Sequence, residues 1–109
     1  MNTGDQQEVQ RLLSHIPFGK ANAIHATDLA KKMGYPTGHN QVELRHLIHE
    51  AIQLGNIILC NTRVGYWRSN SKQEVQAYIN ALNRRADEIY GRSNKIQQAW
   101  NQAHPNNTI

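Results

Sequence analysis

The chain has 109 residues, the size of one ordinary domain; 39% of them are hydrophobic and 18% are charged. This composition excludes the disorder signature of low hydrophobicity with high net charge, and the single cysteine excludes an internal disulfide. The net charge of +4 is compatible with a nucleic-acid partner but does not require one. No segment has the pattern of a signal peptide or the ~18 apolar residues of a membrane span, so we expect a soluble, cytoplasmic protein without membrane contact.

The first quarter of the chain predicts a helix followed by a short extended patch. Asp5 and Glu8 have the spacing of a capping box at the start of this helix, and Pro17 ends it. Its inner face repeats at helical spacing in Val9, Leu12, Leu13 and Ile16. Ala23 and Ile24 then form an apolar patch that could add a brief strand.

Two further helices are predicted, joined by a turn that contains proline and glycine. The first of them is short and ends at Gly34, with an inner face of Leu29, Ala30 and Met33. The second begins at a capping box of Asn40 and Glu43 and ends at Gly55. Its inner face consists of Leu44, Leu47, Ile48, Ala51 and Ile52.

Residues 55–70, GNIILCNTRVGYWRSN, predict two short strands joined by a polar turn with Arg63 at its tip. We expect the strand side chains to be mainly structural, namely Ile57, Leu59, Tyr66 and Trp67. A further capping box, Ser71 with Glu74, then begins a long segment without proline.

The apolar positions of this last segment alternate in steps of four and three over nearly four heptads: Val75, Ile79, Leu82, Ala86, Ile89, Ser93, Ile96 and Trp100. A helix over residues 72–103 would be about 48 Å long, which one small domain cannot cover. Two interpretations remain. In one, the first half of the helix packs on the preceding domain and the second half pairs with a partner chain, either a second copy or a host protein at Ile96 and Trp100. In the other, the helix ends near Gly91 and a loose tail follows. The apolar side chains of the second half favour pairing, and we predict a homodimer held by Ile89, Ile96 and Trp100.

The predicted order of helix, helix, turn, helix, hairpin and long helix is that of a winged helix-turn-helix. Over residues 6–90 the chain resembles small winged-helix proteins, many of them encoded by phages or prophages. The segment that carries the resemblance is ATDLAKKMGYPTGHNQVELRHLIHEAIQLGNIILCNTRVGYWRS. It implies a mainly α fold with a small β-hairpin: a winged helix-turn-helix domain over residues 5–70, a long helix for packing and dimerisation over residues 71–103, and a disordered tail over residues 104–109.

The resemblance also implies a partner, double-stranded DNA, because the third helix of a winged helix enters the major groove. Arginine can pair with guanine and glutamine with adenine, so the predicted base contacts are Gln41, Arg45 and His46. The predicted backbone contacts are Lys31, Lys32, Asn40 and Arg63. The expected function is sequence-specific DNA binding as a homodimer, by a transcriptional regulator or a phage-type replication or accessory factor.

No enzyme, cofactor or metal site is expected. The sequence has neither a Gly-x-Ser-x-Gly motif nor a phosphate-binding glycine loop. His46 and His49 share a helix face, but a metal site needs more ligands. The alternative function is a protein-binding winged-helix module that inhibits a host replication or defence protein, as anti-CRISPR proteins do. Glu43 and Glu50 favour this alternative, because on a DNA-facing surface they would repel phosphates.

Overall fold

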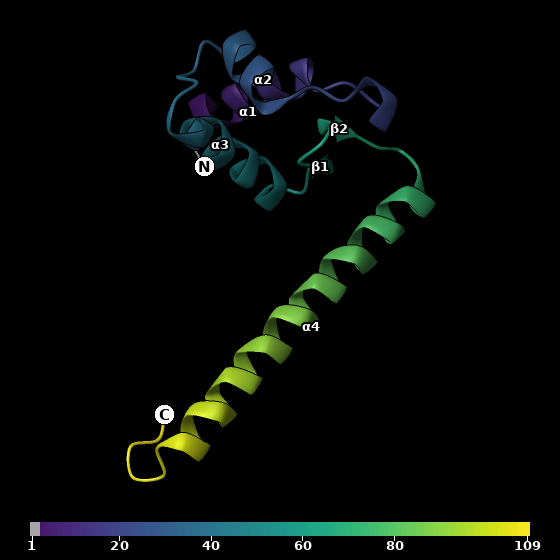
Figure 1. Cartoon of the computed structure of the whole chain (residues 1–109). Helices are drawn as coiled ribbons and strands as arrows, with labels where there is room; N and C mark the ends of the chain where they lie inside the picture. The colour runs from purple at the N-terminus through teal and green to yellow at the C-terminus, as the bar shows by residue number, and fades with distance from the viewer. Residues whose placement is uncertain (1–2) are drawn as a thin grey trace. The chain divides into compact units, whose positions relative to one another are not determined.

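The computed structural model describes residues 3–109, and the chain divides into two compact units, Met1–Ser71 and Lys72–Ile109 (Figure 1). The elements in chain order are α1 (Thr3–His15), η1 (Lys20–Asn22), α2 (Ala26–Met33), η2 (His39–Gln41), α3 (Val42–Gln53), β1 (Ile58–Asn61), β2 (Gly65–Arg68) and α4 (Lys72–Ala103). The predicted fold class, mainly α with a small antiparallel hairpin and a long C-terminal helix, is confirmed.

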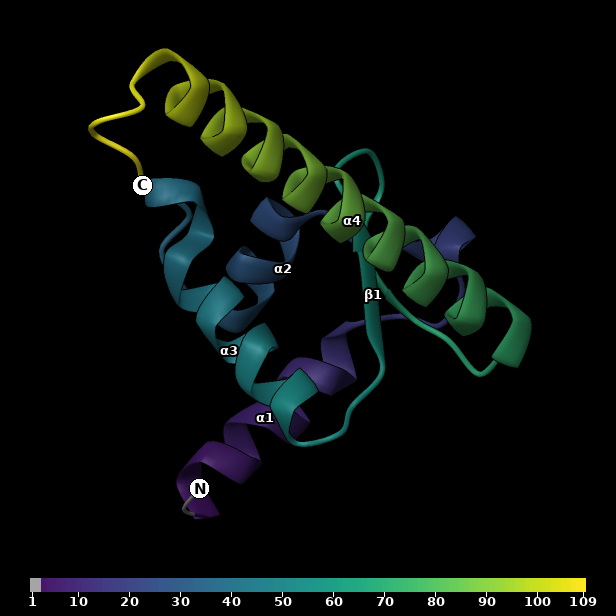
Figure 2. The same ribbon diagram turned by 90° about the horizontal axis from the view of Figure 1, so that it is seen from below.

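Helices α1, α2 and α3 pack against one another around a single apolar core (Figure 2). Each contributes a leucine that is 0% exposed: Leu12, Leu29 and Leu44. Burying each such side chain stabilises the fold by about 1.5–3 kcal/mol. The inner faces predicted for the three helices are confirmed, except that Ile52 is 45% exposed.

Glycines end α2 and α3 as predicted. Gly34 and Gly55 have φ angles of +75° and +96°, in the left-handed region that glycine adopts without steric cost. The residue after each glycine donates its N–H back to the helix: Tyr35 to the Ala30 carbonyl at 2.9 Å, and Asn56 to the Ala51 carbonyl at 3.1 Å. These bonds satisfy carbonyl groups that a helix end would otherwise leave unpaired.

The helix starts predicted for α1 and α3 are wrong. Helix α1 begins at Thr3, so Asp5 lies inside its first turn. Before α3, the three residues of η2 have positive φ angles of 53°, 58° and 54°. Asn40 lies inside this left-handed turn, one residue before the cap of the helix, so Asn40 and Glu43 do not have the N-cap and N3 positions of a capping box. The N-cap of α3 is Gln41, without a side-chain capping bond.

Strand β2 is hydrogen-bonded along both of its edges. On one edge it pairs antiparallel with β1. On the other edge, Ile24 and Tyr66 exchange two backbone hydrogen bonds of 2.9 and 2.8 Å. Beside them, the Arg68 N–H donates to the Pro17 carbonyl at 2.8 Å, and the Arg68 carbonyl accepts from Gly19 at 2.9 Å. The connection between α1 and α2 therefore holds the hairpin in place, and the predicted brief strand is present as a bridge at Ile24.

The first strand begins one residue later than predicted. Strand β1 begins at Ile58, which is 6% exposed and joins the helical core. Leu59 is buried opposite Trp67 on the other face of the hairpin, since successive strand residues point to opposite faces. Ile57 precedes the strand and is 51% exposed, so its predicted structural role is wrong.

Helix α4 is one uninterrupted helix of 32 residues, and no residue along this fully described element is buried. It continues through Gly91, so the interpretation that it ends there is wrong. Its large apolar side chains remain exposed: Ile79, Leu82, Ile89, Tyr90, Ile96 and Trp100. Neither α4 nor any other helix within residues 3–109 is long and apolar enough to cross a membrane.

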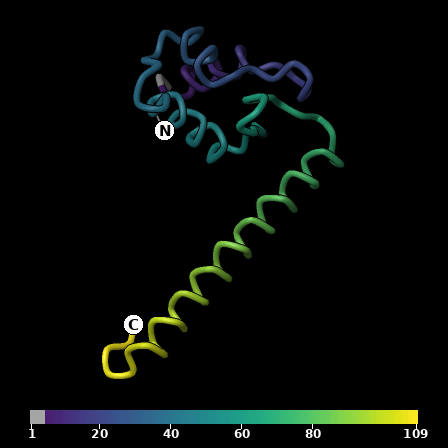
Figure 3. The backbone as a smooth tube through the Cα atoms, in the orientation of Figure 1, coloured from purple at the N-terminus to yellow at the C-terminus, as the bar shows by residue number. Residues whose placement is uncertain are grey.

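Residues 104–109 differ from the predicted disordered tail, because they turn back onto the end of α4 (Figure 3). The Trp100 indole N–H donates to the Asn107 carbonyl at 2.7 Å. The His104 ring stacks on the same indole, with ring centroids 3.9 Å apart. We call residues 104–109 the C-terminal hook.

Gly65 generates the first testable prediction. A Cβ atom at this position would lie 2.1 Å from the Ile24 carbonyl oxygen, and the φ angle of +98° is unfavourable for other residues. We therefore expect Gly65→Ala to lower the free energy of unfolding by at least about 2 kcal/mol. Urea unfolding monitored by Trp67 fluorescence, in a Trp100→Phe background, measures the loss.

The matched control for this change is Gly38→Ala. Gly38 has a φ angle of −81°, and an added Cβ would meet nothing within 4 Å. We expect this variant to change the free energy of unfolding by less than about 0.5 kcal/mol. Equal stability of the two variants would contradict the close approach at Gly65.

Candidate nucleic-acid interface

The exposed side of α3 has two flanks of opposite charge. Residues three, four or seven positions apart share one face of a helix. Arg45 and His49 therefore lie together on one flank, and Glu43 and Glu50 lie together on the other. We call these the basic flank and the acidic flank.

The charge of Arg45, on the basic flank, acts on a tyrosine of the hairpin. Burial raises the pKa of Tyr66 in β2 above its usual value, the neighbouring Cys60 raises it further, and the positive charge of Arg45 acts in the opposite direction.

The acidic flank lies on the opposite side, towards α1. Glu43 and Glu50 line an open hollow of about 590 Å³ between α1 and α3. The other lining residues are Asp5 and Glu8 of α1, Tyr35 after α2, and Val42, His46 and Leu47 of α3. His46, a predicted base contact, is therefore placed among carboxylates and away from Arg45. Within residues 3–109, no three histidine, cysteine or carboxylate side chains come together in a way that would hold a metal ion.

Gln41, the third predicted base contact, is used by the turn that precedes α3. Its side-chain nitrogen donates to the Thr37 carbonyl at 2.8 Å and to the Thr27 hydroxyl at 3.4 Å. A bidentate contact with adenine needs both the amide nitrogen and the amide oxygen of glutamine. The amide nitrogen of Gln41 is therefore already engaged within the protein. His49, which the prediction omitted, is exposed one turn after Arg45 on the same flank.

The hairpin tip holds Arg63 on an ordered turn. The Asn61 side-chain oxygen accepts hydrogen bonds from the N–H groups of Arg63 at 2.9 Å and Val64 at 2.8 Å. Such side-chain bonds mimic a backbone turn and fix the path of the chain. The Arg63 side chain is exposed. Arg63, a predicted contact with the DNA backbone, therefore lies on a turn whose backbone is fixed by hydrogen bonds.

The other predicted backbone contacts lie in two different places. Lys31 and Lys32 are exposed in the last turn of α2 and line a second hollow of about 640 Å³. Its remaining lining residues come from α1, η1, α2 and the segments between them: Ser14, His15, Pro17, Asn22, Ala23, Ile24, His25 and Asp28. Helix α3 contributes no residue to this hollow. Asn40 is exposed in the left-handed turn directly before α3.

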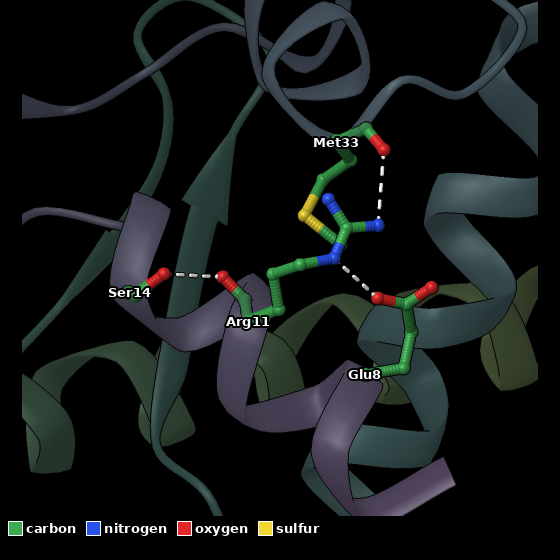
Figure 4. A network of polar contacts seen from close by, with 4 residues as sticks. All are labelled: Glu8, Arg11, Ser14 and Met33. Carbon is green, nitrogen blue, oxygen red and sulfur yellow. Dashed lines mark hydrogen bonds and ion pairs between the residues drawn. The ribbon is translucent and has the colours of Figure 1, made fainter. Parts of the chain in front are cut away.

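A polar network holds α1 against the end of α2, where the turn towards α3 begins (Figure 4). Arg11 donates through Nε to the Glu8 carboxylate at 2.6 Å and through a terminal nitrogen to the Met33 carbonyl at 3.0 Å. The bond to Met33 places a positive charge at the C-terminal end of α2, where the helix dipole favours it. The same guanidinium lies 6.0 Å from the centre of the Tyr35 ring.

Tyr35 generates a prediction about pH. Burial, together with the hydrogen bond to the negatively charged Glu8, raises the pKa of Tyr35 to about 12. Because the folded pKa lies above the usual value of 10.0, the stabilisation is complete below about pH 10 and is lost as the pH rises towards 12. Glu8→Gln removes the carboxylate charge, so we expect it to lower this pKa. Absorbance titration of the phenols, with Tyr35→Phe as the reference that identifies the Tyr35 signal, measures the shift; an unchanged titration would contradict the contact.

Comparison of the chain with protein-family models, with curated proteins and with solved structures found no match. The case for a nucleic-acid interface therefore depends on the exposed basic residues described above, Arg45, His49 and Arg63.

Proposed function

We propose that the protein binds double-stranded DNA in a sequence-specific manner as a homodimer, as a transcriptional regulator or a replication or accessory factor. The observation that carries the proposal is the separation of charge on α3. Glu43 and Glu50, which would repel phosphates, line the hollow beside α1, while Arg45 and His49 lie outside this hollow on the other flank of α3. An approach to DNA with the basic flank forward therefore keeps the acidic flank at a distance.

In this proposal the basic flank of α3 enters the major groove. Arg45 donates to the O6 and N7 acceptors of guanine, and His49 reaches the next bases along the groove. Sequence is read by these side chains, because phosphate contacts carry no direct information about the bases.

Arg63 supplies the contact with the DNA backbone. The Asn61 bonds order the tip of the hairpin, and the hydrogen bonds on both edges of β2 anchor its base. A contact group that is already ordered loses less conformational freedom on binding. One arginine on a short wing then pairs with a phosphate beside the groove that α3 occupies.

The homodimer is supported by the exposed apolar side chains of α4. Ile89, Ile96 and Trp100 are 59%, 63% and 38% exposed. A second copy that covers them would bring two reading helices into one particle. Dimeric helix-turn-helix proteins use this arrangement to read two half-sites about one turn of DNA apart.

One observation favours the alternative, binding to a host protein. The hollow between α1 and α3 combines four carboxylates with the exposed Val42. A basic segment of a protein partner would complement this charge, whereas a phosphate backbone would be repelled. The DNA experiment below separates the two functions.

We expect the protein to shift a pool of random-sequence DNA duplexes in a mobility assay at 50 mM salt, and to lose most of this binding at 200 mM. Arg63→Ala should reduce the slope of log affinity against log salt by about 0.9, because one phosphate contact is lost. Arg45→Ala should weaken binding to a duplex selected from the pool by about 1–3 kcal/mol and relax its sequence preference.

The matched control is Arg84→Ala, which removes the same charge from α4 instead of the winged-helix unit. It should leave the sequence preference unchanged. The absence of any shift at 50 mM salt would contradict DNA binding and leave the protein-binding function. Equal effects of Arg45→Ala and Arg84→Ala would show that binding depends on net charge alone.

A further inference from the structure

We propose that α4 pairs with α4 of a second copy of this chain as a parallel, in-register, two-stranded coiled coil. The inference deepens the proposed function, since it defines the interface and orientation of the homodimer. It does not depend on DNA binding. The partner is a second copy because the pattern of α4 fits itself, as the following features show.

Helix α4 has the two sets of core positions that a coiled coil requires. The a positions are Ile79, Ala86, Ser93 and Trp100, and the d positions are Val75, Leu82, Ile89 and Ile96. The aliphatic side chains of this seam between Ile79 and Ile96 are 44–63% exposed. A seam of this length, along a helix of about 48 Å, matches another helix of the same length better than a compact surface.

The helix also needs a partner for its own stability. Most of the stability of a protein helix comes from the packing of its apolar face. Within α4, Gly91 lowers the helix propensity by about 1 kcal/mol relative to alanine. Gly91 occupies an f position on the outer face, where an added Cβ would meet nothing within 4 Å. The glycine therefore weakens the single helix without interrupting the seam.

The charges beside the seam determine the orientation. The g positions carry Arg85 and Arg92, whereas the e positions carry only uncharged side chains, Asn83, Tyr90 and Gln97. In a parallel pair, g positions face e positions of the partner, so each arginine meets an uncharged residue. In an antiparallel pair, g faces g, and the arginines of the two copies would repel one another. Like charges across an interface are unfavourable, so the parallel pair is favoured.

The parallel pair also gives Arg85 and Ser93 specific partners. Arg85 faces Tyr90 of the second copy, and a guanidinium over a phenol ring is a favourable contact. This contact accounts for Tyr90, which is 71% exposed in one chain. Ser93 faces itself at an a position, where a single polar layer fixes the register of a coiled coil.

The C-terminal hook extends the apolar surface at the end of the seam. The N–H of Ile109 donates to the Asn101 side chain at 2.9 Å, and its main-chain oxygen accepts from Gln97 at 2.8 Å. These bonds place the Ile109 side chain beside Ile89 and Ile96, where the three line a hollow of about 630 Å³. The hook thus widens the surface that a second copy would cover.

Disulfide crosslinking of the full chain, without DNA, tests the orientation. In a Cys60→Ser background, Ser93→Cys places one thiol at an a position, and the control Gln98→Cys places one on the outer face. A disulfide forms only when the two Cα atoms approach within about 7 Å. We expect oxidation to convert Ser93→Cys to a covalent dimer and to leave Gln98→Cys unlinked.

The mass of the Cys60→Ser chain in solution, measured by light scattering, completes the test. The mass of one chain at micromolar concentration would overturn the proposal. A dimer in which Ser93→Cys does not crosslink would also overturn it and would indicate antiparallel pairing.

Arg92→Glu gives a second readout of the orientation. If the pair is parallel, this change should alter the dimer dissociation constant by less than about threefold. If the pair is antiparallel, it should lower the dissociation constant strongly. A stable parallel dimer that binds no DNA would contradict only the proposed function.

Discussion

The backbone contact between Gly65 and Ile24 is the constraint on which the first unit depends. A two-stranded hairpin alone is marginally stable in water, and the bonds at Ile24 give β2 a neighbour on its second edge. They can form only because residue 65 has no side chain, since a Cβ there would collide with the Ile24 carbonyl. The same contact fixes the hairpin beside the helices, so the tip with Arg63 and the basic flank of α3 keep a constant relation.

The charges of the first unit are distributed unevenly over its surface. The chain is basic overall, yet several of its carboxylates gather in the hollow between α1 and α3. Such a separation of charge gives the surface of the unit an acidic side, at this hollow, and a basic flank on α3 outside it. The network around Arg11 supports this polarity, because it holds α1 and the end of α2 together at the border of the acidic hollow.

The sequence was sufficient to predict the parts of the fold that depend on periodicity and on glycine. The helix faces, the ends at Gly34 and Gly55 and the length of α4 follow from spacing and local conformation, which a sequence displays directly. The left-handed turn before α3 could not be predicted, because Gln41 has no strong preference for the left-handed region and its side chain is held by bonds to Thr37 and to the more distant Thr27. The prediction of the base contacts met the same limit. Arg45 and His46 are neighbours in the sequence, but they lie on different flanks of α3. Only the packing of α1 against α3 reveals which of these flanks is acidic.

Gly65 has a consequence for the divergence of this protein. The contact uses only the backbone of Ile24, so position 24 tolerates exchange among apolar side chains, whereas position 65 admits one residue. The tip residues 62–64 carry no such restriction on their side chains, because the bonds that order the tip run from Asn61 to backbone groups. Side chains at the tip can therefore change without disturbing the backbone contacts that hold the hairpin beneath them.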